Sequence, residues 1–274
     1  LGDGLRDLLD PRLRSGALTR PVARTAVEPG RDLPPEDARP PLLAVQGLAT
    51  RFHIGDEVHR AVEDVSFALR RGESLGIVGE SGSGKSVTAL SILGLVPTPP
   101  GRIVAGAVRF EGRDLLGLKL RDLQDIRGNR IAYIFQDPAS TLNPILPVGE
   151  QVAEALRRHR ALGRKAARQR SIELLERVGI EAPERKALAY PHQLSGGQRQ
   201  RVVIAMALAN EPELIIADEP TTALDVTTQA RVLDLLRELQ RSTGAALIFI
   251  THDLGVVTRS EEHTSELQSH LNLV

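Results

Sequence analysis

GESGSGKS, residues 79–86, is the stretch that decides the fold of this 274-residue chain. It fits the pattern G-x-x-x-x-G-K-[ST], follows an apolar run at 74–78 with the character of a strand, and opens an expected helix. In such a loop the backbone amides wrap a β-phosphate, Lys85 reaches the β/γ oxygens and Ser86 ligates Mg²⁺. The alternative is a flexible Gly/Ser turn, which would not require the flanking strand and helix. The sequence therefore predicts a phosphate-binding loop made of Gly79, Glu80, Ser81, Gly82, Ser83, Gly84, Lys85 and Ser86.

Composition excludes several classes of protein. The 35 basic and 35 acidic residues balance, so no global field attracts nucleic acid or an anionic membrane. The absence of cysteine excludes disulfides, thiolate metal sites and a cysteine nucleophile. Apolar runs such as 202–209 and 245–250 are far shorter than the roughly 20 residues that a membrane helix needs. Aromatic residues make up 3%, too few for a base-stacking surface.

The order of apolar patterns along the chain predicts an α/β fold. From Leu42 onward, short alternating runs indicate antiparallel strands that precede the phosphate loop. Continuous apolar runs typical of buried parallel strands occur at 74–78, 130–135, 214–217 and 245–250. Helical spacing occurs at 148–160, 164–178 and 198–209. We expect a nucleotide-binding α/β core with an antiparallel β subdomain and an inserted helical subdomain at about 139–209.

Polar side chains stand at the ends of three further predicted strands. Asp218 and Glu219 end LIIADEP, where Asp218 is expected to hold magnesium and Glu219 to act as base or orienting group for the attacking water. The alternative is a solvated pair that caps a helix. Gln136 and His252 each follow another strand; such a residue alone is usually structural, but strand ends converge at the ligand-binding crevice of an α/β sheet. The neutral amide of Gln136 is placed to contact magnesium or the water.

LSGGQRQR, residues 194–201, predicts a second phosphate-binding site. Ser195 precedes Gly196 and Gly197 at a helix start, which offers exposed amides, a hydroxyl and the positive end of the helix dipole. The helical insertion separates this site from the phosphate loop of the same chain. We therefore expect it to serve the nucleotide of another copy.

With these residues in order, the chain resembles the ATP-binding-cassette (ABC) ATPases over about residues 42–257. The resemblance implies a P-loop NTPase (RecA-like) core, ATP and Mg²⁺ as ligands, and a head-to-tail pair of cassettes in which each ATP lies between the phosphate loop of one and the LSGGQ of the other. It also implies γ-phosphate sensing by Gln136 and His252, and nucleotide contacts from Gln198 and from Asp225 in TALD. Phe52 matches the position where the family stacks an aromatic ring on adenine; a plain strand residue is the alternative.

Longer segments, such as FQDPASTLNPILPVGEQ, resemble those of the subfamily that powers dipeptide, oligopeptide and nickel import. This implies an ATPase subunit at the cytoplasmic face of the inner membrane, peripheral or tethered by fusion to a permease. Its partners would be permease subunits, contacted by the segment after Gln136, and indirectly a solute-binding protein. A soluble ABC-type ATPase acting on nucleic acid or ribosomes is the second hypothesis, and a non-functional truncated fragment is the third. The basic run at 157–170 lacks interleaved aromatics, so we interpret it as a solvated helix face and expect no nucleic-acid partner.

The two ends of the chain differ in character from its middle. Residues 1–41 resemble the tail of a permease subunit followed by a linker, which predicts a fusion of permease and ATPase. Residues 259–274 lose the expected apolar patterning, and 259–269 match the translation of a widely used sequencing adapter. We interpret 259–274 as a non-native read-through tail, so the cassette at 42–258 is expected to be truncated at its C-terminus.

Overall fold

The computed structural model describes residues 40–222 and 224–252. By its contacts the chain divides into two compact units, residues Leu1–Gln124 with Ile248–Val274 as unit 1 and Asp125–Leu247 as unit 2. All but the last two residues of the predicted permease-like segment and linker, and the whole predicted read-through tail, lie outside the described residues. These two predictions therefore stay predictions.

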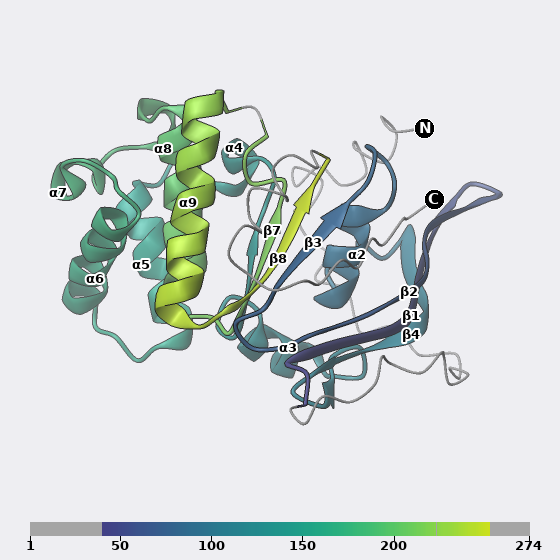
Figure 1. Ribbon diagram of the computed structural model, residues 1–274. Coiled ribbons are helices and arrows are strands. Elements are labelled where there is room, and N and C mark those ends of the chain that lie inside the picture. Colours follow the sequence, from purple (N-terminus) through teal and green to yellow (C-terminus); the bar gives the residue numbers. More distant parts are fainter. Residues whose placement is uncertain (1–39, 223, 253–274) are drawn as a thin grey trace. The chain divides into compact units, whose positions relative to one another are not determined.

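Unit 1 contains an antiparallel sheet with the strand order β2-β1-β4-β5. Its central strand β1 is paired on both sides, so that Leu43 lies opposite Leu69 of β2 and Phe110 of β4. All three of these side chains are buried. Strands β2, β1 and β4 lie side by side in Figure 1. The bounds are β1 Leu43–Ile54, β2 Glu57–Leu69, β4 Gly101–Phe110 and β5 Arg113–Asp114.

The phosphate-loop segment of unit 1 joins β3 (Ser74–Val78) to α2 (Lys85–Ile92). Helix α2 packs against β1 and β2 and is buried almost all round, which explains why its sequence is apolar or small at nearly every position after Ser86. The Ser91 hydroxyl bonds Val87 O at 2.6 Å and lies 2.8 Å from Thr50 Oγ1. The last turn of α2 is therefore tied to β1 through Thr50. Helix α3 (Leu120–Ile126) follows β5.

Unit 2 is built on the parallel pair β6 (Ile131–Ile134) and β7 (Leu214–Asp218), whose register runs from Ile131↔Leu214 to Ile134↔Ala217. Every residue of β7 is buried, as expected of a strand covered on both faces. Strand β8, Ala246–Thr251, begins at the end of unit 2 and continues into unit 1.

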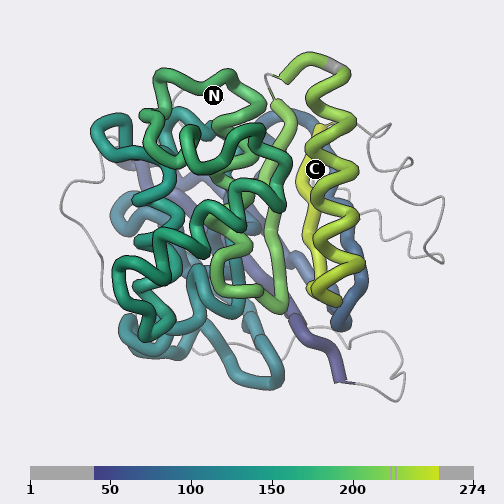
Figure 2. The backbone as a smooth tube through the Cα atoms, turned by 90° about the vertical axis from the view of Figure 1, so that its left-hand side faces the viewer, coloured from purple at the N-terminus to yellow at the C-terminus, as the bar shows by residue number. Residues whose placement is uncertain are grey.

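The connection from β6 to β7 is helical. Helices α5 and α6 pack against each other and against α8, and α8 also contacts α4 and β6; the green helices of this segment are gathered together in Figure 2. The α5 residues Val148, Val152 and Leu156 are buried because their spacing places them on one helix face. The bounds are α4 Pro138–Thr141, α5 Val148–His159, α6 Arg164–Arg177, α7 Pro183–Lys186, the 3₁₀ turn Pro191–Gln193, α8 Gly196–Leu208 and, after β7, α9 Val226–Thr243.

These elements confirm the predicted fold class, a mixed α/β architecture with an antiparallel and a parallel sheet and a helical insertion. The expected strand at 74–78 is β3, and the expected helix at 148–160 ends one residue earlier, at His159. The limits assigned to the helical subdomain, about 139–209, stay a prediction. Among the described residues, no helix combines the length and apolarity needed to cross a membrane.

Candidate functional site

The phosphate loop wraps around the buried amino group of Lys85. Lys85 is 4% exposed, and its Nζ donates hydrogen bonds to the carbonyl oxygens of Gly79 at 2.8 Å and Glu80 at 2.7 Å. A buried ammonium is costly unless it is hydrogen-bonded, so these carbonyls hold the charge inside the loop. Ser86 follows in the first turn of α2, where helix amides favour an anion.

Two glycines give the loop its shape. Gly84, at the N-cap of α2, has a φ of 88°, and a Cβ built there would lie 2.0 Å from Ala61 O. A Cβ on Gly79 would lie 2.7 Å from Ser83 Oγ. No L side chain fits at Gly84, because the backbone of β2 occupies the space and the conformation is left-handed. The loop is therefore a backbone-lined cradle of the kind that accepts phosphate.

Asp218 ends β7 in unit 2 and is 5% exposed. The Tyr133 hydroxyl, from β6, donates a hydrogen bond to Asp218 Oδ2 at 2.7 Å. This bond offsets part of the cost of burying the carboxylate. Tyr133 was missed by sequence reasoning, although a polar hydroxyl within the apolar run predicted as a strand at 130–135 was a usable signal.

Glu219 meets Gln136, as the strand-end argument predicts. Gln136 Nε2 and Thr222 Oγ1 both donate to Glu219 Oε2, each at 2.8 Å. The backbone of Glu219 has a φ of 43°, a left-handed conformation that is uncommon outside glycine. Thr222 was also missed by sequence reasoning. Its position three residues after Glu219, within a turn, was the available indication.

The LSGGQ segment begins α8 with a reciprocal capping box. Ser195 Oγ accepts from the Gln198 amide at 3.3 Å, and Gln198 Oε1 accepts from the Ser195 amide at 3.2 Å. A Cβ on Gly197 would lie 2.5 Å from Thr228 Cγ2, whereas one on Gly196 would meet Leu224 at an ordinary 3.7 Å. The start of α8 therefore packs closely on the first turn of α9.

Asp225 is the N-cap of that neighbouring helix. Its Oδ1 accepts a hydrogen bond from the Thr228 amide at 3.0 Å. This backbone bond, followed by the hydrogen bond with the Thr228 side chain, lowers the pKa of Asp225 below its ordinary value of 3.8. Ser195 and Asp225 thus cap two helix starts, and Thr228 contacts both segments.

The segment after Gln136 is braced by one buried amide. Gln151, 4% exposed, accepts from the Asn143 amide at 2.8 Å and donates to the carbonyl oxygens of Asn143 and Leu146, each at 2.9 Å. Ile145, between these two, is 77% exposed. The loop thus has a fixed backbone and displays an apolar side chain.

The structure places the remaining predicted residues in unit 1. Phe52 lies in β1 with 1% exposed, and a Cβ on Gly101 would lie 2.9 Å from its Cε1. The Phe52 side chain is part of the hydrophobic core. Stacking of Phe52 on adenine therefore stays a prediction, and it requires the residues packed over the ring, such as Gly101, to move. His252 is exposed, directly after β8. The phosphate loop, Phe52 and His252 belong to unit 1, whereas Gln136, Asp218, Glu219, Ser195–Gln198 and Asp225 belong to unit 2.

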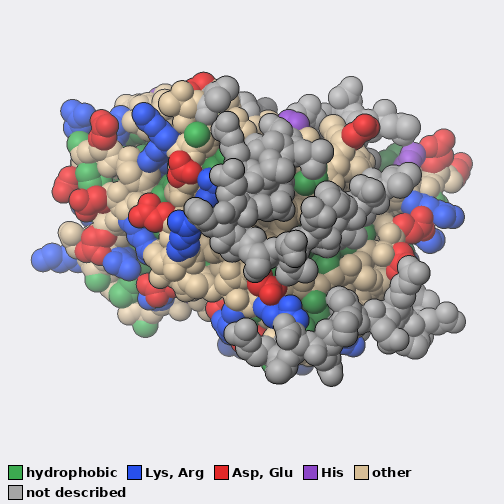
Figure 3. Space-filling view, viewed as in Figure 1, with side chains coloured by type: hydrophobic (Ala, Val, Ile, Leu, Met, Phe, Trp, Pro, Cys, Tyr) green, Lys and Arg blue, Asp and Glu red, His purple; other side chains and the backbone are tan. Residues whose placement is uncertain are grey.

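The basic run at 157–170 lies on α5, on α6 and between them, and several of its members form ion pairs. Arg157 pairs with Glu150, Arg160 with Glu211, and Arg170 with both Glu173 and Glu211. On the face drawn in Figure 3, blue and red side chains alternate over the helical part of the molecule, on the left of the view. This arrangement agrees with the interpretation of the run as a solvated helix face.

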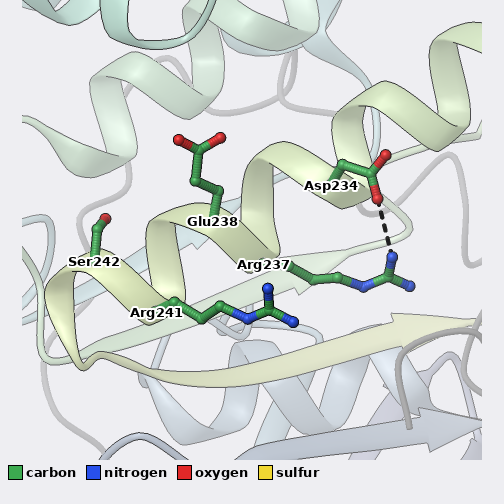
Figure 4. Close-up of a pocket in the computed structure, with 5 residues that line it drawn as sticks. All are labelled: Asp234, Arg237, Glu238, Arg241 and Ser242. Carbon is green, nitrogen blue, oxygen red and sulfur yellow. Dashed lines mark hydrogen bonds and ion pairs between the residues drawn. The ribbon is translucent and has the colours of Figure 1, made fainter. Parts of the chain in front are cut away.

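A shallow surface pocket on α9 contains none of the predicted site residues. It is lined by Asp234, Arg237, Glu238, Arg241 and Ser242. In Figure 4 these side chains all come from α9, and Asp234 Oδ1 accepts from Arg237 at 3.0 Å. The lining of the pocket is mostly charged and comes from a single helix.

The side chains present fit a nucleoside triphosphate with magnesium. Unit 1 supplies a backbone cradle at Gly79–Ser86 and the cation of Lys85, which are groups that bind phosphate, and unit 2 supplies the buried carboxylate of Asp218, a group that can support a metal ion. Magnesium usually keeps several waters and takes one or two protein oxygens together with the phosphates. A cluster of three or more His, Cys, Asp or Glu side chains is absent from the described residues, and this mode of binding does not require one.

Comparison with known proteins agrees with this chemistry. Residues 62–222 match the family model described as ABC transporter. The chain is 54% identical over 217 residues to the oligopeptide transport ATP-binding protein OppD of Bacillus subtilis (strain 168), covering 79% of this chain and 60% of that protein. It is also 54% identical over 219 residues to the peptidoglycan transport ATP-binding protein YejF of Agrobacterium fabrum, covering 80% of this chain and 40% of that one. The chain therefore spans about half of these relatives' length.

A solved structure has the same fold. The ATP-binding cassette MJ0796, in a dimeric post-hydrolysis state bound to ADP and Pi, superposes with a TM-score of 0.70 and is 35% identical. The match covers 78% of this chain and 89% of that one.

Proposed function

Because this chain belongs to the ABC transporter family, we propose that it binds and hydrolyses ATP to power the import of peptides across the cytoplasmic membrane. The observation that carries the proposal is the side-chain cluster at the end of β7, where Glu219 accepts hydrogen bonds from Gln136 and Thr222 directly after the buried Asp218. A carboxylate held in this way after a metal-supporting aspartate suits the orientation of an attacking water. Peptides are the cargo class because the relatives described above are named for oligopeptide and peptidoglycan transport.

Each residue of the site has a proposed role in this reaction. The Gly79–Ser86 amides and Lys85 bind the β- and γ-phosphates. Ser86, Asp218 and Gln136 would hold magnesium, which would supply charge neutralisation on the phosphate oxygens. Glu219 orients the water and accepts its proton. His252 and Gln136 sense the γ-phosphate. Asp225 completes the nucleotide contacts, and Phe52 would join them once the packing around its buried ring opens.

We further propose that two cassettes pair head to tail. Ser195, Gly196, Gly197 and Gln198 of one copy then bind the phosphate held by the loop of the other, since Ser195 Oγ, the adjacent amides and the helix dipole suit an anion. The MJ0796 cassette, described as dimeric, supports this arrangement. Permease subunits at the cytoplasmic face of the membrane, contacted by the Gln151-braced segment, complete the assembly, with a solute-binding protein acting through them.

The decisive variant is Glu219→Gln in the full chain. We expect turnover to be lost while ATP affinity is retained, because the amide keeps the shape but accepts no proton. Glu184→Gln, an exposed residue of α7, makes the same chemical change elsewhere and should hydrolyse ATP normally. Lys85→Ala should lose ATP affinity as well. Undiminished hydrolysis by Glu219→Gln refutes the role.

Pairing is tested on the same variant. With ATP and magnesium, Glu219→Gln should elute as a dimer in size-exclusion chromatography, since the nucleotide is not consumed. A cassette that remains monomeric when saturated with ATP contradicts the head-to-tail proposal.

A further inference from the structure

The pairing of β6 with β7 places Tyr133 and Asp218 on one face of the sheet. Tyr133 lies opposite Ile216, and alternate residues along a strand share a face, so Ile216 and Asp218 project to the same side as Tyr133. A diagonal neighbour two residues along the adjacent strand is within reach of a long aromatic side chain. The 2.7 Å bond from the Tyr133 hydroxyl to Asp218 Oδ2 spans this diagonal.

A second aromatic residue supports the Tyr133 ring. The ring centroids of Tyr133 and Phe135 lie 4.5 Å apart, and the rings are tilted by 52°. Phe135 is two residues further along the chain, so it covers the side of Tyr133 that leads toward the end of the strand. The ring contact with Phe135 and the hydrogen bond to Asp218 together restrict the rotamers open to Tyr133.

The hydrogen bond makes the two oxygens of Asp218 inequivalent. Asp218 is 5% exposed, and a carboxylate without a fixed donor turns about its terminal torsion over a broad range. A bond from a tyrosine hydroxyl to Oδ2 sets the plane of the carboxylate. Because a carboxylate has about four lone-pair sites, this bond leaves capacity for further contacts.

We propose that Tyr133 is a positioning residue that fixes the carboxylate plane in which Asp218 supports magnesium, with Phe135 holding the tyrosine ring. The inference rests on the proposed role of Asp218 in metal binding. Tyr133 acts through Asp218 and contacts neither the nucleotide nor the ion. Residues that hydrogen-bond to a metal-supporting carboxylate orient it, and their removal typically weakens metal affinity by about 10- to 100-fold.

The test is a double-mutant cycle on metal affinity, made in the full chain carrying Glu219→Gln so that ATP is not consumed. Mn²⁺ is titrated into the protein with ATP, and the bound ion is measured by electron paramagnetic resonance. Tyr133→Phe removes the hydroxyl, and Asp218→Ala removes both carboxylate oxygens. Tyr190→Phe, at the chain's other tyrosine, is the matched control. Thermal unfolding and ATP binding in EDTA identify any variant that is damaged in fold.

We expect Tyr133→Phe to weaken Mn²⁺ binding about tenfold, with ATP binding in EDTA unchanged. Combined with Asp218→Ala, it should have no further effect, because residues that act through one contact are not additive. The inference is overturned if Tyr133→Phe leaves Mn²⁺ affinity unchanged. It is also overturned if Tyr133→Phe weakens Mn²⁺ binding as much in the Asp218→Ala background as in its absence, or if it weakens ATP binding in EDTA. Unchanged Mn²⁺ affinity in Asp218→Ala itself overturns the proposed metal role of Asp218 instead.

Discussion

The hydroxyl of Thr222 donates a hydrogen bond to Oε2 of Glu219 at 2.8 Å, the same oxygen that accepts from Gln136 Nε2. Two donors on one oxygen fix the direction of the Glu219 side chain. The Gln136 partner comes from a distant part of the sequence, whereas Thr222 comes from the turn that directly follows Glu219.

Thr222→Val keeps the shape of the side chain and removes this donor. We expect kcat for ATP hydrolysis to fall about tenfold, because a hydrogen bond to a charged group contributes roughly 1.5–3 kcal/mol. The ATP concentration at half-maximal rate should not change, since Thr222 is not placed in the phosphate loop. Thr222→Ser restores the hydroxyl and should restore kcat; a kcat for Thr222→Val equal to wild type contradicts the positioning role.

Gly197→Ala should destabilise the protein. The new Cβ would lie 2.5 Å from Thr228 Cγ2, so the starts of α8 and α9 must separate, and overpacking of this kind costs about 1–3 kcal/mol. Thermal unfolding measures the loss. Gly196→Ala is the control, because its Cβ has ordinary contact distances.

The same contact predicts a specific rescue. Thr228→Ser removes the Cγ2 methyl and keeps the hydroxyl that bonds Asp225. In the Gly197→Ala background it should recover most of the lost stability. If the double variant is as unstable as Gly197→Ala alone, the clash with Thr228 is not the cause.

Gly82 and Gly84, the two glycines of the phosphate loop with positive φ, should differ in how well they tolerate substitution by alanine. Gly82 has a φ of 86° and open space around it, so alanine there costs only backbone strain of about 1–2 kcal/mol. Gly84→Ala adds a clash with Ala61 O at 2.0 Å and should abolish nucleotide binding. Titration with a fluorescent ATP analogue compares the two variants, and equal affinities would count against the cradle geometry.

Asp225 predicts a pH dependence of stability. Its hydrogen bonds with Thr228 lower its pKa in the folded state below 3.8, so it stabilises the fold above that pH, and the contribution is lost as the pH falls through the folded pKa. Asp225→Asn keeps the capping oxygen without the charge. Its free energy of unfolding, from urea titrations, should therefore fall less steeply than that of wild type below about pH 4. Asp56→Asn, in the exposed turn between β1 and β2, makes the same change in net charge and is the control. If the free energy of unfolding falls equally steeply with pH for wild type and Asp225→Asn, Asp225 does not contribute to the pH dependence.

The sequence predicted the elements whose patterns are local. The continuous apolar run at 74–78 and the helical spacing at 148–160 correspond closely to β3 and α5, because burial of a whole strand or of one helix face leaves a direct trace in residue order. The meeting of Gln136 with Glu219 was also predicted, since neighbouring parallel strands end at the same edge.

Other features depend on contacts between distant segments. Strand β4 was not anticipated, because its place beside β1 is set by pairing that a single stretch of sequence does not encode. The burial of Phe52 beside Gly101 has the same origin. The left-handed Glu219 and its bond from Thr222 were missed because non-glycine residues give no compositional sign of that conformation.

Gln151 holds the main chain of the loop at 143–146 without involving the side chain that the loop exposes. Three backbone groups of Asn143 and Leu146 depend on one amide of α5, and the Ile145 side chain, 77% exposed, takes no part in that support. A substitution of Ile145 therefore leaves the hydrogen bonds that set the path of the main chain in place. The chemical character of this exposed surface can thus be altered by one side chain without rebuilding the loop that carries it.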